Sequence, residues 1–188
     1  MKILQTPARF PPYTGGVEQY TYILSKKMVE RGHDVTVLCA NEPEQAATRT
    51  EYEGISVVRH DYVGKIAQTN LTHGLPATLY REAKDADVVH THLPTPWTAD
   101  LNELVSAVTG TPSVLTYHND IRGQGIVSYV ADLYNATAMQ LTLSLTDQII
   151  TTQKSYFADS NIPKRHENKV TTIRNGVDVE RFQPMAVD

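Results

Sequence analysis

Two adjacent glycines, Gly15 and Gly16, stand where a strand-like run of the sequence ends and a helical pattern begins. Without side chains they let the backbone come close to a ligand, and the first turn of a helix offers unpaired N–H groups and the positive end of the helix dipole. This combination suits a phosphate group. Glycines at such a turn also occur where a helix merely packs closely on a sheet, so the pair alone leaves both explanations open.

Three histidines lie near the ends of two other strand-like runs. His90 and His92 are two residues apart, so on a strand they share a face, where a third histidine could complete a metal site. The sequence places no carboxylate or thiol beside them, and polar side chains at strand ends commonly pair with neighbouring backbone, so we expect no metal. His118 is followed two residues later by Asp120, whose carboxylate could orient the imidazole or form an Asx turn.

Short apolar runs alternate with helical stretches along the whole sequence. The runs are rich in β-branched residues and predict buried strands at 3–6, 35–39, 55–59, 88–91, 113–117, 148–152 and 170–173. Helices are expected from residue 17 to a stop at Gly32, within 76–84, from 96 to a stop at Gly110, and within 126–145. This alternation predicts an α/β fold, a three-layer α/β/α sandwich with a mostly parallel sheet. The glycine pair and the three histidines would then meet at the edge where the strands end, which is where such sheets bind ligands.

Three expectations concern less regular segments. The polar segments 41–53 and 61–74 are expected to be loops. The second begins at the ligand-binding edge and carries Tyr62 and Lys65. In the helix within 126–145 an apolar stripe is expected, formed by Ile126, Val130, Leu133, Thr137, Leu141 and Leu145.

The composition is that of an ordinary globular domain. The 188 residues include 17 Lys and Arg against 21 Asp and Glu, unlike the basic surface typical of nucleic-acid-binding proteins. The single cysteine, Cys39, lies in a predicted strand, so we expect it to be buried and without a catalytic role. The amino terminus lacks a signal-peptide pattern, and no apolar run is long enough to span a bilayer. These features predict a soluble, cytoplasmic protein.

Several motifs resemble, in their order, those of retaining glycosyltransferases of family 4, which have the GT-B fold. They are 15–18 (Gly-Gly-Val-Glu), 32–37 (Gly-His-Asp-Val-Thr-Val), 87–92 (Asp-Val-Val-His-Thr-His), His118-x-Asp120, and 173–178 (Ile-x-Asn-Gly-Val-Asp) with Arg181-Phe182. The resemblance covers essentially the whole chain and corresponds to the amino-terminal half of such an enzyme. It implies that 1–174 form a Rossmann-like acceptor-side domain, and that 175–188 begin the linker to a donor-binding domain absent from the sequence.

The resemblance also implies a reaction and its residues. A hexose would pass from a nucleotide diphosphate sugar to a hydroxyl group of a glycan, lipid or small molecule, with retention of configuration and without a metal or cofactor. Gly15 and Gly16 would hold the donor diphosphate. Catalytic His118 would orient and polarise the transferred sugar, with Asp120 and Asn175 in support. Candidate acceptor contacts are Arg9, Glu18, Tyr62 and Lys65. For Glu18 the helix dipole offers an equally simple explanation.

Other functions stay open at this point. Nucleotide-sugar 2-epimerases share the two-domain architecture, and Rossmann-like folds also serve as non-catalytic binding modules. The proline-rich loop before Gly15 lacks the Gly-x-Gly-x-x-Gly fingerprint, which disfavours an NAD-dependent enzyme. A reading frame that continues beyond Asp188 into a second α/β domain would favour the transferase. For a lipid acceptor, the candidate membrane contacts are Lys65, Arg81 and Lys84.

Overall fold

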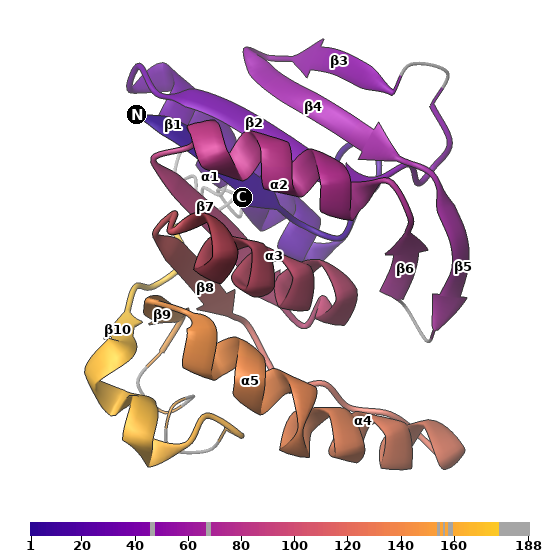
Figure 1. Cartoon of the computed structure of the whole chain (residues 1–188), viewed down its shortest axis with the longest axis vertical. Coiled ribbons are helices and arrows are strands. Elements are labelled where there is room, and N and C mark those ends of the chain that lie inside the picture. Colours follow the sequence, from indigo (N-terminus) through magenta and orange to yellow (C-terminus); the bar gives the residue numbers. More distant parts are fainter. Residues whose placement is uncertain (46–47, 67–68, 154, 156, 158–159, 177–188) are drawn as a thin grey trace, which may run out of the picture.

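The chain folds around one eight-stranded sheet, in the strand order β10-β9-β8-β7-β1-β2-β4-β3 (Figure 1). The computed structural model describes residues 1–45, 48–66, 69–153, 155, 157 and 160–176. The strands are β1 (Lys2–Thr6), β2 (Asp34–Ala40), β3 (Arg49–Tyr52), β4 (Ile55–His60), β7 (Val88–Leu93), β8 (Ser113–Tyr117), β9 (Gln148–Thr151) and β10 (Val170–Thr172). Neighbouring strands are parallel except β3 and β4. A separate antiparallel pair consists of β5 (Tyr62–Ile66) and β6 (Thr69–Thr72).

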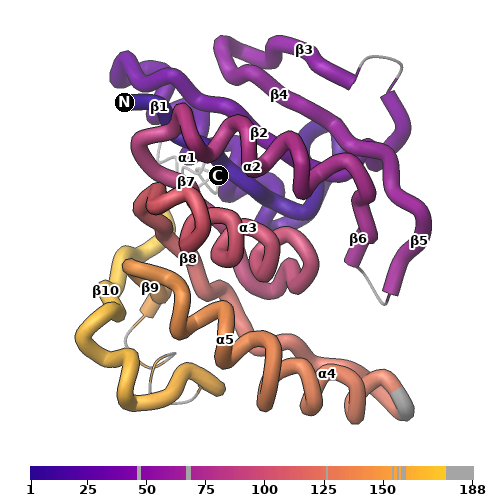
Figure 2. The backbone as a smooth tube through the Cα atoms, in the orientation of Figure 1, coloured from indigo at the N-terminus to yellow at the C-terminus, as the bar shows by residue number. Residues whose placement is uncertain are grey.

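Helices cover both faces of the sheet. Side chains alternate between the two faces along each strand, so apolar residues of the strands on either face pack against helices. The helices are α1 (Gly16–Glu30), α2 (Leu75–Asp85), α3 (Pro96–Thr109), α4 (Ile126–Ala136) and α5 (Ala138–Leu145), with a 3-10 helix, η1 (Lys164–Lys169). On one face, Ile3 and Val35 pack against Met28 of α1. On the other, Leu4 and Leu38 pack against Leu79 of α2. Figure 2 shows that α4, α5, β9 and β10 lie together at one end of the molecule.

The sequence predicted this architecture well. All seven expected strands are present, and α1, α2 and α3 lie where helices were expected. Gly110 ends α3 with a left-handed φ of 72°, which glycine adopts without strain. Cys39 is fully buried in β2, and burial raises the pKa of its thiol to about 12.

Two expected loops are wrong in part. Segment 41–53 contains β3, a short edge strand that pairs with β4 and keeps most of its side chains exposed. Segment 61–74 contains β5 and β6, which pair with each other outside the main sheet. Neither segment has the apolar signal of a buried strand, because edge strands and isolated pairs bury few side chains.

The single helix expected within 126–145 is also wrong, because Thr137 has a non-helical backbone (φ −125°, ψ −86°) that separates α4 from α5. The break misaligns the expected apolar stripe. Val130 and Leu133 are 55% and 65% exposed, whereas Met139 and Leu143 of α5 are fully buried. The periodicity assumed one continuous helix, and a change of direction moves each later residue to another face.

Candidate active site

Two neighbouring strands, β7 and β8, place the three histidines together. In the parallel register, His92 of β7 pairs with Thr116 of β8, so the two strands end side by side. The backbone N–H of His118 donates to the carbonyl of Leu93 (3.0 Å), which continues the ladder one residue beyond β8. His118 is therefore held by its own backbone at the edge of the sheet, where it is half-buried.

His90, His92 and His118 form what we call the imidazole cluster. The ring centroids of His90 and His92 are 4.5 Å apart, and the ring of His118 stacks on His92 at 5.6 Å. The shortest contact joins Nε2 of His118 to Nδ1 of His92 (3.4 Å). Nε2 of His90 lies 2.8 Å from the hydroxyl of Thr116. Tyr20 of α1 completes the packing, with its ring edge-on to His118 at 4.9 Å.

The imidazole cluster is neutral at pH 7. Burial lowers the pKa of His90 to about 3 and that of His118 to about 4. Burial, followed by the proximity of the other two rings, lowers the pKa of His92 well below its usual value. A buried imidazolium would lose its hydration without gaining a counter-ion. The cluster can therefore orient groups by hydrogen bonding, but it cannot bind an anion by charge.

The two glycines at the start of α1 have different surroundings. Gly15 is extended (φ −164°), and a Cβ built on it would lie 2.3 Å from Oε2 of Glu18, so the carboxylate fills the space of the missing side chain. A Cβ built on Gly16 would meet no atom within 4 Å. Tyr20 lies one helical turn after Gly16 on the same helix. The open first turn of α1 and the ring of His118 thus belong to one edge of the sheet.

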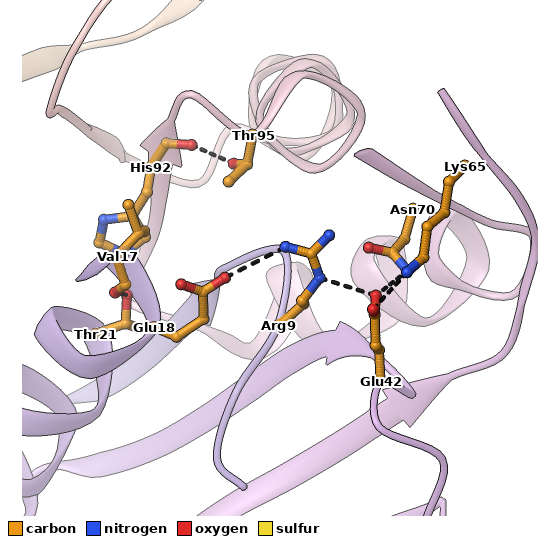
Figure 3. Close-up of polar contacts among 9 residues, drawn as sticks. All are labelled: Arg9, Val17, Glu18, Thr21, Glu42, Lys65, Asn70, His92 and Thr95. Carbon is orange, nitrogen blue, oxygen red and sulfur yellow. Dashed lines mark hydrogen bonds and ion pairs between the residues drawn. The ribbon is translucent and has the colours of Figure 1, made fainter. Parts of the chain in front are cut away.

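A second polar cluster, the Arg9 network, consists of Arg9, Glu18, Glu42, Lys65 and Asn70 (Figure 3). Nε of Arg9 donates to Glu42 (2.9 Å), and the guanidinium also lies 3.7 Å from Glu18. Glu42 accepts two further hydrogen bonds, from the Asn70 amide (2.7 Å) and from Lys65. Burial opposes the charge of Glu42, but these donors outweigh it and lower the pKa of Glu42 to about 2. The network joins the loop before α1 to the β5–β6 pair.

Comparison with known proteins identifies the family. The sequence model of Glycosyltransferase Family 4 matches residues 14–181, most of the chain. The chain belongs to Glycosyltransferase Family 4. No curated protein gives a significant sequence match.

Solved structures share the fold of this family 4 chain. HepE (Alr3699) from Anabaena, solved in complex with UDP, superposes with a TM-score of 0.62 and 19% identity, over 96% of this chain and 45% of HepE. Sucrose-phosphate synthase from Thermosynechococcus elongatus superposes with a TM-score of 0.56 and 17% identity, over 98% of this chain and 50% of the synthase chain. Both are GT-B glycosyltransferases, so the expected fold of one GT-B half is confirmed. The chain spans about half the length of these structures, between 45% and 50%.

The structure brings together most of the residues expected at a family 4 site. Arg9, Glu18 and Lys65 belong to one network, and Lys65 also lies over the ring of Tyr62 at 5.4 Å. Through Glu18 this network reaches Gly15. Each basic residue considered for a membrane contact has a partner within the chain. Lys65 bonds to Glu42, Arg81 lies 3.9 Å from Glu82 of its own helix, and Lys84 lies over the ring of Tyr80 at 5.4 Å.

Asp120 bonds to other groups than the ring of His118, and Asn175 follows β10, which lies two strands from β8 in the sheet. Asp120 accepts hydrogen bonds from the hydroxyl of Tyr117 and from the backbone N–H of Asn161 (3.1 Å), so it holds the loop after β8 instead of the imidazole. Asn175 is exposed after β10. The rest of its motif, Val177-Asp178 with Arg181-Phe182, falls outside the described residues.

Sequence reasoning expected His92 to meet His118 at the sheet edge but gave it no role in the site. It missed Tyr20, which was only one position of a helical repeat. The spacing from Gly16 to Tyr20, one helical turn, was a usable signal for Tyr20. Among the described residues, no three His, Cys, Asp or Glu side chains are arranged to hold a metal ion. No helix in the described part of the chain is both long and apolar enough to cross a membrane.

Proposed function

We propose that the chain is the acceptor-side part of a retaining hexosyltransferase, which transfers a hexose from a nucleotide diphosphate sugar to a hydroxyl acceptor. The observation that carries this proposal is the meeting of two features at one sheet edge. The open first turn of α1 at Gly16 suits a diphosphate, and the neutral ring of His118 suits a sugar. Tyr20 connects the two, since it belongs to α1 and packs on His118. The binding of UDP and UDP-glucose by HepE, which has the same fold, supports this assignment.

In the proposed reaction, the protein positions the substrates and stabilises charge. Backbone N–H groups at the start of α1 would bind the diphosphate, whose charge grows as the bond to the sugar breaks. The leaving phosphate would take the proton of the acceptor hydroxyl on the same face of the sugar, which retains the configuration. Neutral His118 would hold the sugar in place. The acceptor would approach from the side of Arg9, Glu18, Tyr62 and Lys65.

Donor recognition would be shared with a second domain. The family 4 resemblance assigns most nucleotide contacts to that domain, so residues 1–188 alone would bind a nucleotide sugar weakly and transfer nothing. A sheet of this size buries its own core, so we expect this part of the chain to fold independently.

Nuclear magnetic resonance can test the phosphate assignment even when binding is weak. UDP titrated into the ¹⁵N-labelled chain should shift the backbone amide signals of Gly16 and Val17. Gly16→Val should weaken this response at least about tenfold, because the new side chain would enter the open space where the phosphate approaches. Gly64→Val is the matched control, since a Cβ on Gly64 also meets no atom within 4 Å but lies on β5. An equal response in Gly16→Val and in the wild type would contradict the assignment.

A further inference from the structure

The buried amide of Gln5 lies between a sulfur atom and an imidazole, and this fixes its orientation. Its Nε2 lies 3.7 Å from Sδ of Met28, and its Oε1 lies 3.2 Å from Nε2 of His92. Gln5 is fully buried, so water does not compete for either end. A thioether sulfur can only accept hydrogen bonds. The NH₂ group of Gln5 must therefore face Met28, and its carbonyl oxygen must face His92.

This orientation determines which nitrogen of each imidazole carries a hydrogen. Because Oε1 of Gln5 can only accept, Nε2 of His92 must donate, and in a neutral ring Nδ1 then holds a lone pair. Nε2 of His118, 3.4 Å away, must in turn donate to Nδ1 of His92. Nδ1 of His118 is consequently left with a lone pair. Burial keeps both rings neutral by lowering their pKa values, so a second hydrogen on either ring is disfavoured.

Neighbouring groups do not compete with this chain of hydrogen bonds. His90 bonds to the hydroxyl of Thr116 and not to His118. The carboxylate of Asp120, which is closest in sequence, bonds to Tyr117 and Asn161. Within the described residues, Nδ1 of His118 has no hydrogen-bond partner. It is therefore available to a ligand.

We propose that Gln5 and His92 are positioning residues that fix the tautomer of His118, so that its Nδ1 accepts a hydrogen bond from a hydroxyl group of the bound sugar. The ligand part of this statement rests on the proposed transferase function, whereas the tautomer does not. An unprotonated nitrogen can take a hydrogen bond from a hydroxyl but cannot give one to a phosphate oxygen. His118 would therefore recognise the sugar, and the phosphate would depend on the first turn of α1.

Replacing Gln5 by the isosteric glutamate should reverse the direction of the hydrogen bonds from position 5 through His92 to His118. Position 5 is fully buried, and burial raises the pKa of a carboxyl group, so the new side chain is kept protonated and donates to Nε2 of His92. Nδ1 of His92 then carries a hydrogen and donates to Nε2 of His118. The hydrogen of His118 must then move to Nδ1. Gln148→Glu makes the same change at the amino end of β9, at the opposite end of the strands, and serves as the control.

Long-range ¹H–¹⁵N spectra of the histidine side chains read the tautomer directly, without donor or acceptor. This separates a failure of the tautomer proposal from a failure of the transferase assignment. We expect hydrogen on Nε2 of His92 and His118 in the wild type and in Gln148→Glu, and on Nδ1 of His118 in Gln5→Glu. Hydrogen on Nδ1 of His118 in the wild type would overturn the proposal, even if Gln5→Glu does not fold. A folded Gln5→Glu whose new carboxyl group is protonated and whose His118 is unchanged would also overturn it. In the complete transferase, Gln5→Glu should lower kcat/KM for UDP-glucose about tenfold, as expected for the loss of one hydrogen bond.

Discussion

The imidazole cluster and the Arg9 network lie at the carboxyl edge of the same sheet, yet the first is neutral and the second is charged. In the imidazole cluster, burial lowers the pKa of every ring. In the Arg9 network, Glu42 is also withdrawn from water, but three donors hold its pKa at about 2. The two clusters therefore respond to the same loss of hydration in opposite ways, because only one contains opposite charges.

The difference indicates separate tasks. A neutral cluster can accept a hydrogen bond at one nitrogen and donate one at another, which would suit the uncharged sugar of the proposed reaction. A network of full charges is better suited to fix backbone segments relative to one another, and this one joins the loop before α1 to the β5–β6 pair. Three experiments on the complete protein or the chain test whether the two clusters differ in this way.

The largest effect is expected from His118→Ala. Transfer by the complete enzyme should fall on the order of 100-fold, because a positioned polar group at the reacting sugar would be lost. Steady-state kinetics and thermal melting would measure this. The melting temperature should hardly change, since His118 is only half-buried at the end of the sheet. His73→Ala, at an exposed histidine, should leave the rate unchanged. Near wild-type turnover in His118→Ala would remove this residue from the site.

Glu42→Gln should have the next largest effect, this time on stability. Arg9 is buried, and the substitution would leave it without its nearest carboxylate, at a cost of about 2–3 kcal/mol in the free energy of unfolding. Urea denaturation would measure the loss. Glu53→Gln is the matched control, since Glu53 forms an exposed ion pair with Lys26 and the substitution should lower the free energy of unfolding much less. Equal losses in the two variants would show that the Arg9 network is no more than a surface ion pair.

The smallest expected effect is the pH dependence due to His90. Its folded-state pKa, about 3, lies below the value of about 6.5 expected when unfolded. Its contribution to stability is therefore present above pH 6.5 and is lost as the pH falls toward 3, by about 2 kcal/mol at pH 5. Unfolding at pH 7 and pH 5 should show this loss in the wild type and a smaller one in His90→Gln. An identical pH dependence in both proteins would contradict the neutral state of this ring.

The sequence predicted the elements with a strong apolar signal and missed those defined by tertiary contacts. Buried strands such as β2 and β8 contain runs of β-branched residues that clearly predict a strand. In contrast, β3 is polar, and it forms a strand because it pairs with β4. The break between α4 and α5 at Thr137 could not be predicted, because Thr137 is neither a proline nor a glycine and neither residue type lies next to it. At the candidate site, strand ends were enough to find His118. The contact with His92 depends on the register of β7 and β8, which no local pattern encodes.

Because the first turn of α1 and Tyr20 belong to one helix, the geometry of the helix fixes the distance between the proposed phosphate site and the aromatic ring that packs on His118. Each residue advances about 1.5 Å along the axis and turns by about 100°, so four residues separate Gly16 from Tyr20 by about 6 Å on nearly the same side. Loop lengths around the sheet could change without altering this distance. A single residue inserted between positions 16 and 20 could not be absorbed in the same way, since it would turn the aromatic ring away from His118 while leaving the helix itself intact.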